Sequence, residues 1–93
     1  MPEQEARRWI VIGQVQGVGY RYFARQAGQA LGARGWVRNL PDGTVEVQVA
    51  GAPELLQRFK TELARGPRGC RVEDIEEERL VQVPTWQGFN IVF

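Results

Sequence analysis

Short apolar runs separated by glycine, proline and polar residues predict the strands of this chain. Residues 8–13 (RWIVIG) are mostly apolar and β-branched and end at a glycine, which predicts a first strand. A Pro-Asp-Gly turn at residues 41–43 predicts a hairpin, because proline presets φ and glycine accepts a positive φ. The hairpin strands are residues 35–40 and 44–50, and two more strands are predicted at residues 71–81 and 89–93.

The segment 44–50 (TVEVQVA) alternates polar and apolar side chains. This is the pattern of a strand with one buried and one solvated face. We therefore expect the three valines to face the core and the polar side chains to face water. The valines are Val45, Val47 and Val49, and the polar residues are Thr44, Glu46 and Gln48.

Two other segments repeat apolar residues at helical spacing. The first helix is predicted from Tyr20 to the glycine at position 32, and the second from Pro53 to the residue before Gly66. Tyr20, Tyr22 and Phe23 are interpreted as packing residues of the first helix. The apolar stripes are Tyr20, Phe23, Ala27, Ala30 and Leu31 in the first helix and Leu55, Leu56, Phe59 and Leu63 in the second.

The resulting order, βαββαβ with a short extra C-terminal strand, predicts a single α+β domain over residues 1–93. This is the ferredoxin-like plan, in which two helices cover one face of an antiparallel sheet. The first two strands run parallel with the third between them, joined by a right-handed crossover. The loop after residue 13 and Asn39 should therefore share one sheet edge, separated by about 10 Å.

Missing residue types exclude several reaction classes. The chain has no histidine and no serine, and its only lysine is Lys60, which excludes serine triads, histidine bases and Walker A loops. Cys70 is the only cysteine, so an internal disulfide and a zinc site of cysteines and histidines are excluded too. Catalysis would have to use arginine, amide, carboxylate, tyrosine, threonine and backbone groups.

The charge and hydropathy of the chain limit which binding partners and which cellular location are expected. No run approaches the roughly 18 apolar residues of a membrane span, and the N-terminus lacks an apolar signal, so we expect a cytoplasmic protein without membrane contact. Residues 1–40 hold six basic and two acidic side chains, whereas residues 41–93 hold six basic and nine acidic ones. This asymmetry suits a small anionic substrate better than nucleic acid, which requires a strongly basic stripe.

The loop between the first strand and the first helix has the features of an anion site. Residues 13–21 (GQVQGVGYR) lead into a helix N-terminus, where free N–H groups and the helix dipole favour an anion. Gly17 and Gly19 can adopt the positive φ that a nest of amides requires. Arg21 in the first turn opposes the dipole by about 0.3 to 1 kcal/mol. An anion held between Arg21 and the loop would reverse this penalty.

This loop and a second segment resemble the two signatures of the acylphosphatase family. GQVQGVGYR resembles the first signature, GWVRNLPDGTVEVQVAG at residues 35–51 resembles the second, and the resemblance extends over almost the whole chain. It implies hydrolysis of a small-molecule acyl phosphate without a cofactor or a metal. In that family, loop amides and one arginine bind phosphate, and an asparagine orients the attacking water. The implied phosphate-binding residues are Gln14, Val15, Gln16, Gly17, Val18, Gly19, Tyr20 and Arg21, and the implied catalytic residues are Arg21 and Asn39.

Two positions depart from the family pattern. Gln14 stands where arginine is common, and Val92 stands where a basic residue is usual. Both lie outside the core motif, so they affect the outer electrostatics rather than the reaction type.

The resemblance also implies a mechanism without a protein base. Phosphoryl transfer proceeds through a loose transition state with its charge on the equatorial oxygens. Arg21 and the loop amides would stabilise that charge, and the Asn39 amide would hold the water in line. The substrate's own phosphate would take the proton of the water.

The sequence also allows alternatives to acyl phosphate hydrolysis and to the role of Asn39. Arg34-Gly35-Trp36 is similar to the start of an RNA-recognition signature, but Val37 and Arg38 break that signature, so we expect no nucleic-acid partner. A non-catalytic domain that binds phosphate or carbamoyl phosphate is the main alternative, and a turn-capping role is the alternative for Asn39. We expect the protein to act as a monomer.

Overall fold

The computed structural model describes residues 3–93, so positions 1 and 2 of the expected domain lie outside the described residues. Seven elements follow in the predicted order. They are β1 (Glu5–Gln14), α1 (Tyr20–Leu31), β2 (Arg34–Asn39), β3 (Val45–Gly51), α2 (Pro53–Arg65), β4 (Arg71–Arg79) and β5 (Phe89–Ile91). Neither helix in this range is long and apolar enough to cross a membrane.

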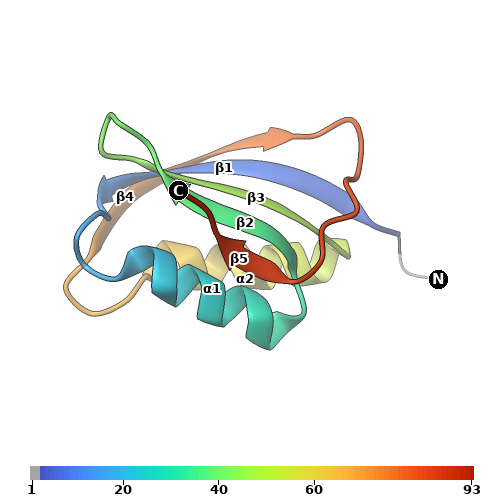
Figure 1. Cartoon of the computed structure of the whole chain (residues 1–93), viewed down its shortest axis with the longest axis horizontal. Helices are drawn as coiled ribbons and strands as arrows, with labels where there is room; N and C mark the ends of the chain where they lie inside the picture. The colour runs from blue at the N-terminus through green and yellow to red at the C-terminus, as the bar shows by residue number, and fades with distance from the viewer. Residues whose placement is uncertain (1–2) are drawn as a thin grey trace.

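Both helices lie against the same face of one five-stranded sheet with the order β4-β1-β3-β2-β5 (Figure 1). The pairs β1·β3, β1·β4 and β2·β3 are antiparallel, and β1 and β2 flank β3 as predicted. The extra C-terminal strand pairs in parallel with β2, which makes the sheet mixed rather than wholly antiparallel. The ferredoxin-like α+β prediction is confirmed.

The helices span the predicted residues, whereas several strands end elsewhere than their hydropathy indicates. β1 extends back to Glu5, because Glu5 pairs with Gly51 and Ala6 pairs with Ala50 of the neighbouring strand. β4 stops at Arg79 and β5 stops at Ile91. The length of each strand therefore depends on how far a neighbouring strand offers backbone partners. A local hydropathy pattern carries no information about these partners.

Aromatic rings join the two layers in the core. The Phe59 ring of α2 makes edge contacts with Trp9 of β1 and with Phe89 of β5, at centroid distances of 5.7 and 5.1 Å. Gly28 of α1 lies over the same Phe89 ring, and a Cβ atom at this position would approach the ring to 2.7 Å. The missing side chain at Gly28 thus lets α1 pack closely on β5.

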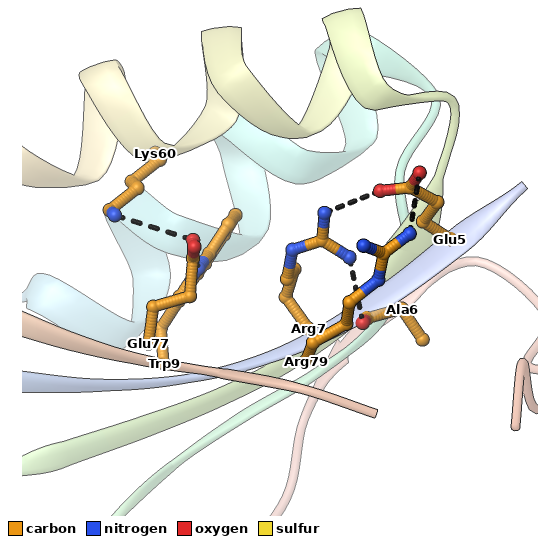
Figure 2. Close-up of polar contacts among 7 residues, drawn as sticks. All are labelled: Glu5, Ala6, Arg7, Trp9, Lys60, Glu77 and Arg79. Carbon is orange, nitrogen blue, oxygen red and sulfur yellow. Dashed lines mark hydrogen bonds and ion pairs between the residues drawn. The ribbon is translucent and has the colours of Figure 1, made fainter. Parts of the chain in front are cut away.

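Hydrogen bonds and ion pairs connect the edge strand β4 with β1 and α2 (Figure 2). The Glu77 carboxylate accepts hydrogen bonds from the Trp9 indole at 2.7 Å and from Lys60 of α2 at 3.3 Å. These contacts hold the pKa of Glu77 below its usual range, with the Trp9 bond as the main cause. Glu5 pairs with Arg7 beside it and with Arg79 at the end of β4.

The expectation that Glu46 faces water is wrong. Glu46 points to the sheet face without helices, yet only 2% of the residue is exposed. β3 is the central strand, so Arg8 of β1 and Arg38 of β2 lie on either side and both pair with the carboxylate. Burial raises the pKa of Glu46, but the hydrogen bonds from Arg8, Arg38 and Gln48 outweigh it, and the pKa lies below its ordinary value.

Candidate active site

The β1–α1 loop has the backbone conformation that an anion nest requires. Gly17 and Gly19 have φ values of 77° and 76°, in the left-handed region that favours glycine. Gly19 directly precedes α1, and its carbonyl accepts the Phe23 amide at 3.0 Å. The first turn of α1 carries no acidic side chain, so Arg21 is the charged side chain beside the free N-terminal amides of this helix.

The sheet register brings Asn39 to the same edge as this loop. Val45 of β3 pairs with Val11 of β1 on one side and with Asn39 of β2 on the other. Asn39 lies two residues beyond Val37, which is buried on the helix-covered face, so Asn39 points to that face as well. The predicted neighbourhood of loop and asparagine is therefore confirmed.

A pocket of about 190 Å³ lies where the loop, the start of α1 and the end of β2 meet. It contains six of the predicted site residues and three others. Its lining consists of Val15, Gly17, Gly19, Tyr20, Arg21, Tyr22, Asn39, Ile91 and Phe93. A larger hollow of about 380 Å³ lies between the two helices, and none of the predicted site residues borders it.

Three predicted phosphate-binding residues lie beside the pocket rather than in its lining. Gln14 ends β1 and pairs with Arg71 of β4. Val18 packs against the hydrophobic core. The side-chain amide of Gln16 is directed to the β2–β3 turn, where it donates to two carbonyls. Phosphate binding by these three residues stays a prediction. It would use their backbone amides.

Asn39 presents an unsatisfied acceptor to this site. Its Oδ1 atom is buried and has no hydrogen-bond partner among residues 3–93. Asp42, and not Asn39, caps the β2–β3 turn. Its carboxylate accepts hydrogen bonds from the Thr44 amide at 3.0 Å and from the Thr44 hydroxyl at 2.6 Å. These bonds lower the pKa of Asp42. A buried acceptor without a partner is costly, and an ordered donor in the pocket would relieve that cost.

Arg21 carries the positive charge of the pocket. Its guanidinium carbon lies 5.1 Å from the ring centroid of Phe93, which places the cation over an aromatic face. No carboxylate in the described part of the chain pairs with Arg21. The guanidinium is therefore free to bind an anion held by the loop.

The tyrosines of the first turn differ from one another. Tyr20 is buried as predicted, and its hydroxyl donates to the Leu63 carbonyl of α2 at 2.7 Å. Burial raises the pKa of Tyr20. Tyr22 is 54% exposed and borders the pocket, so its interpretation as a packing residue is wrong. Its position next to Arg21 in the same turn was the signal that could have identified it.

Ile91 and Phe93 were not among the predicted site residues. They belong to the C-terminal segment, which β5 brings beside β2 and hence beside Asn39. Within residues 3–93, no group of three or more histidine, cysteine, aspartate or glutamate side chains could hold a metal ion.

Comparisons with known proteins place this chain among the acylphosphatases. A family model described as Acylphosphatase matches residues 7–91. The chain is 48% identical over 87 residues to an acylphosphatase of Solibacter usitatus (strain Ellin6076), covering 94% of this chain and 90% of the relative. It is 40% identical over 86 residues to one of Bacillus licheniformis, covering 92% of this chain and 96% of the relative.

Solved structures share the fold. The acylphosphatase of Bacillus subtilis superimposes with a TM-score of 0.93 at 35% identity, covering 96% of this chain and 99% of that chain. Full-length HypF in its phosphate- and nucleotide-bound form superimposes with a TM-score of 0.87 at 26% identity, covering 100% of this chain and 12% of HypF. The family match over nearly all of the sequence and these similarities establish that the chain belongs to the acylphosphatase family.

Proposed function

We propose that this protein hydrolyses the carboxyl–phosphate bond of acyl phosphates to a carboxylate and inorganic phosphate. The observation that carries the proposal is one pocket that combines a glycine-rich helix N-terminus with an arginine that has no ion pair and a buried asparagine oxygen that has no hydrogen-bond partner among residues 3–93. Relatives named acylphosphatase support the same reaction.

The phosphate group of the substrate binds to the loop amides and to Arg21. Amides at a helix N-terminus and a planar guanidinium both match phosphate oxygens. In the loose transition state the negative charge is spread over the equatorial oxygens, and these oxygens accept hydrogen bonds from the donors. The donors are fixed before the reaction, which is the condition for electrostatic stabilisation of a transition state.

Asn39 orients the nucleophile. Its buried Oδ1 accepts a hydrogen bond from the water, which then lies on the side of the phosphorus opposite the carboxylate. The water oxygen forms a bond to phosphorus, the phosphorus–carboxylate oxygen bond breaks, and its electron pair leaves with the carboxylate. A phosphate oxygen of the substrate takes the proton of the water.

We propose that the reaction needs no metal ion. Arg21 and the loop amides supply the positive charge that a divalent cation supplies in other phosphoryl-transfer enzymes. A carboxylate is a good leaving group, so positioning and charge stabilisation suffice without a protein base.

The alternative is a domain that binds phosphate without catalysis. The similarity to a small part of HypF, whose structure is a phosphate-bound form, favours this possibility. Turnover distinguishes the two functions, since both need the same phosphate-binding loop.

We also propose that the protein acts as a monomer. The edge strand β4 carries a row of exposed charged side chains, and the opposite edge strand β5 has only three residues. Charged and short edges discourage the pairing of sheets between molecules.

The proposed function is tested with purified protein in the presence of a chelator. Acetyl phosphate and benzoyl phosphate are the substrates, and the release of inorganic phosphate or the loss of absorbance is followed over time. We expect hydrolysis that is insensitive to the chelator and absent from an Arg21→Ala variant purified in the same way. Phosphate binding without any turnover would show that the domain only binds its ligand.

A further inference from the structure

The side chain of Gln16 connects the phosphate loop to the turn that follows Asn39. Its Nε2 atom donates one hydrogen bond to the Leu40 carbonyl and one to the Thr44 carbonyl, both at 2.8 Å. An amide NH₂ group has two hydrogens, so both are used by these carbonyls. The two bonds join segments that lie 24 and 28 residues apart in the chain.

The acceptors of these bonds belong to a closed turn. The Thr44 carbonyl also accepts the Leu40 amide at 2.9 Å, and the Leu40 carbonyl accepts the Gly43 amide at 3.2 Å. Leu40 directly follows Asn39 in the chain. A displacement of this turn would therefore move the backbone that carries the Asn39 side chain.

The loop on the other side contains two glycines with positive φ. Gly17 and Gly19 follow Gln16, and glycine backbones sample a wide range of conformations. Among residues 3–93, a Cβ atom at either glycine would meet nothing within 4 Å, so both positions border open space. The Gln16 side chain supplies a direct connection between this loop and the sheet edge that holds Asn39.

We propose that Gln16 is a positioning residue, whose side-chain amide sets the distance between the phosphate-binding loop and Asn39. This inference rests on the proposed function, in which the loop holds the phosphate and Asn39 holds the water. The two reactants are then bound by different segments, and their separation depends on the Gln16 bonds. A displacement of about 1 Å can reduce a rate by about 10²-fold.

The test compares Gln16→Met with a matched control, Gln29→Met. Both variants remove a side-chain amide that donates to a backbone carbonyl, since Gln29 donates to the Phe89 carbonyl at 3.1 Å, outside the pocket lining. We expect Gln16→Met to lower kcat per folded molecule by about 10- to 100-fold, and Gln29→Met to change it by less than about 2-fold. The inhibition constant of inorganic phosphate should change by less than about 3-fold in both variants.

A double-variant cycle with Asn39→Ala shows whether Gln16 acts through Asn39. In the Asn39→Ala background, Gln16→Met should lower kcat by less than about 2-fold, because the group that it positions is already absent. An equal loss in both backgrounds would overturn the proposal. So would a phosphate inhibition constant that rises in proportion to the loss of kcat, since Gln16 would then serve phosphate binding.

A measurement without turnover separates this inference from the proposed function. The chain contains two asparagines, Asn39 and Asn90, so the side-chain amide signal of Asn39 can be assigned in a ¹⁵N correlation spectrum by comparison with Asn39→Ala. We expect this signal to shift in Gln16→Met and to stay in place in Gln29→Met. An unmoved signal in folded Gln16→Met would overturn the proposal, and a protein without any hydrolysis would overturn only the proposed function.

Discussion

Arg21 shows how one residue links the local sequence to the proposed chemistry. A cation in the first turn of a helix is unfavourable by about 0.3 to 1 kcal/mol, and no carboxylate among residues 3–93 compensates its charge. The ring of Phe93 gives the guanidinium a cation–π contact, but it does not neutralise the charge. A bound phosphate would neutralise it with two parallel hydrogen bonds.

We therefore expect Arg21→Lys to be almost as inactive as Arg21→Ala, with a loss of kcat/KM of at least about 10²-fold in both. Lysine keeps the charge, but its ammonium group does not reproduce the planar pair of donors. Steady-state kinetics on acetyl phosphate measure the effect. A lysine variant that retained most of the activity would show that charge alone suffices.

The role of Asn39 can be separated from phosphate binding. Asn39→Ala should lower kcat by at least about 10²-fold, the scale observed when one preorganised polar group is removed from a reacting centre. The inhibition constant of phosphate should hardly change, because Arg21 and the loop amides bind that group. Kinetics with phosphate as inhibitor measure both quantities.

If Asn39 only capped the turn, the Asn39→Ala substitution would have a different result. A cap contributes about 1 kcal/mol to the free energy of unfolding, and its loss would leave kcat of the folded molecules intact. Urea denaturation of the same Asn39→Ala preparation measures this contribution. Near-normal kcat in a destabilised variant would remove Asn39 from the mechanism.

At the scale of elements, Gly35 controls how closely β2 approaches β3. Its φ is 152°, and a Cβ atom at this position would lie 1.9 Å from the Gln48 carbonyl oxygen of β3. A side chain would push β2 away from its partner, and β2 carries Asn39 at its end. The packing of two strands thus determines the position of a site residue.

Gly35→Ala should reduce the free energy of unfolding by about 2 to 4 kcal/mol, from backbone strain and overpacking together. The matched control is Gly32→Ala at the end of α1, where φ is 77° and a Cβ atom would meet nothing within 4 Å in the described part of the chain. This control should cost only about 1 to 2 kcal/mol, from the left-handed backbone alone. Equal losses in urea denaturation would contradict a clash between the strands.

At the scale of the whole molecule, Glu46 joins three strands on the face without helices. Arg8 of β1 and Arg38 of β2 converge on this carboxylate of the central strand. Its pKa is lower in the folded protein than in the unfolded chain. Such a carboxyl contributes stability above its unfolded pKa of about 4.3, and this contribution is lost as the pH falls through its folded pKa.

We expect Glu46→Gln to be less stable than the parent protein by about 1.5 to 3 kcal/mol at pH 7, because hydrogen bonds to a charged group are lost. The difference should shrink as the pH falls below about 4.3, the pKa of a glutamate in the unfolded chain, because the unfolded parent then takes up a proton that the folded protein binds only at lower pH. Urea denaturation across this pH range measures it, with Glu73→Gln at an exposed position of β4 as the control. A difference that stays constant down to pH 3 would contradict the role of the Glu46 charge.

Features that depend on neighbouring residues could be predicted from the sequence alone. The helices follow from apolar spacing and terminal glycines, and α1 and α2 have the predicted bounds. The loop with Arg21 could be identified because strand end, glycines and helix start are contiguous in residues 13–21. The order of these elements also sufficed to place Asn39 near the loop, since parallel strands share one edge.

Features that depend on partners distant in the chain became visible only in the folded protein. Glu46 is buried because two arginines from other strands cover it, although its own segment alternates like a solvated face. Ile91 and Phe93 border the pocket because β5 pairs in parallel with β2, and Gln16 reaches carbonyls more than 20 residues away. Burial and hydrogen bonding of these side chains are properties of the assembled sheet, so no pattern within one segment contains them.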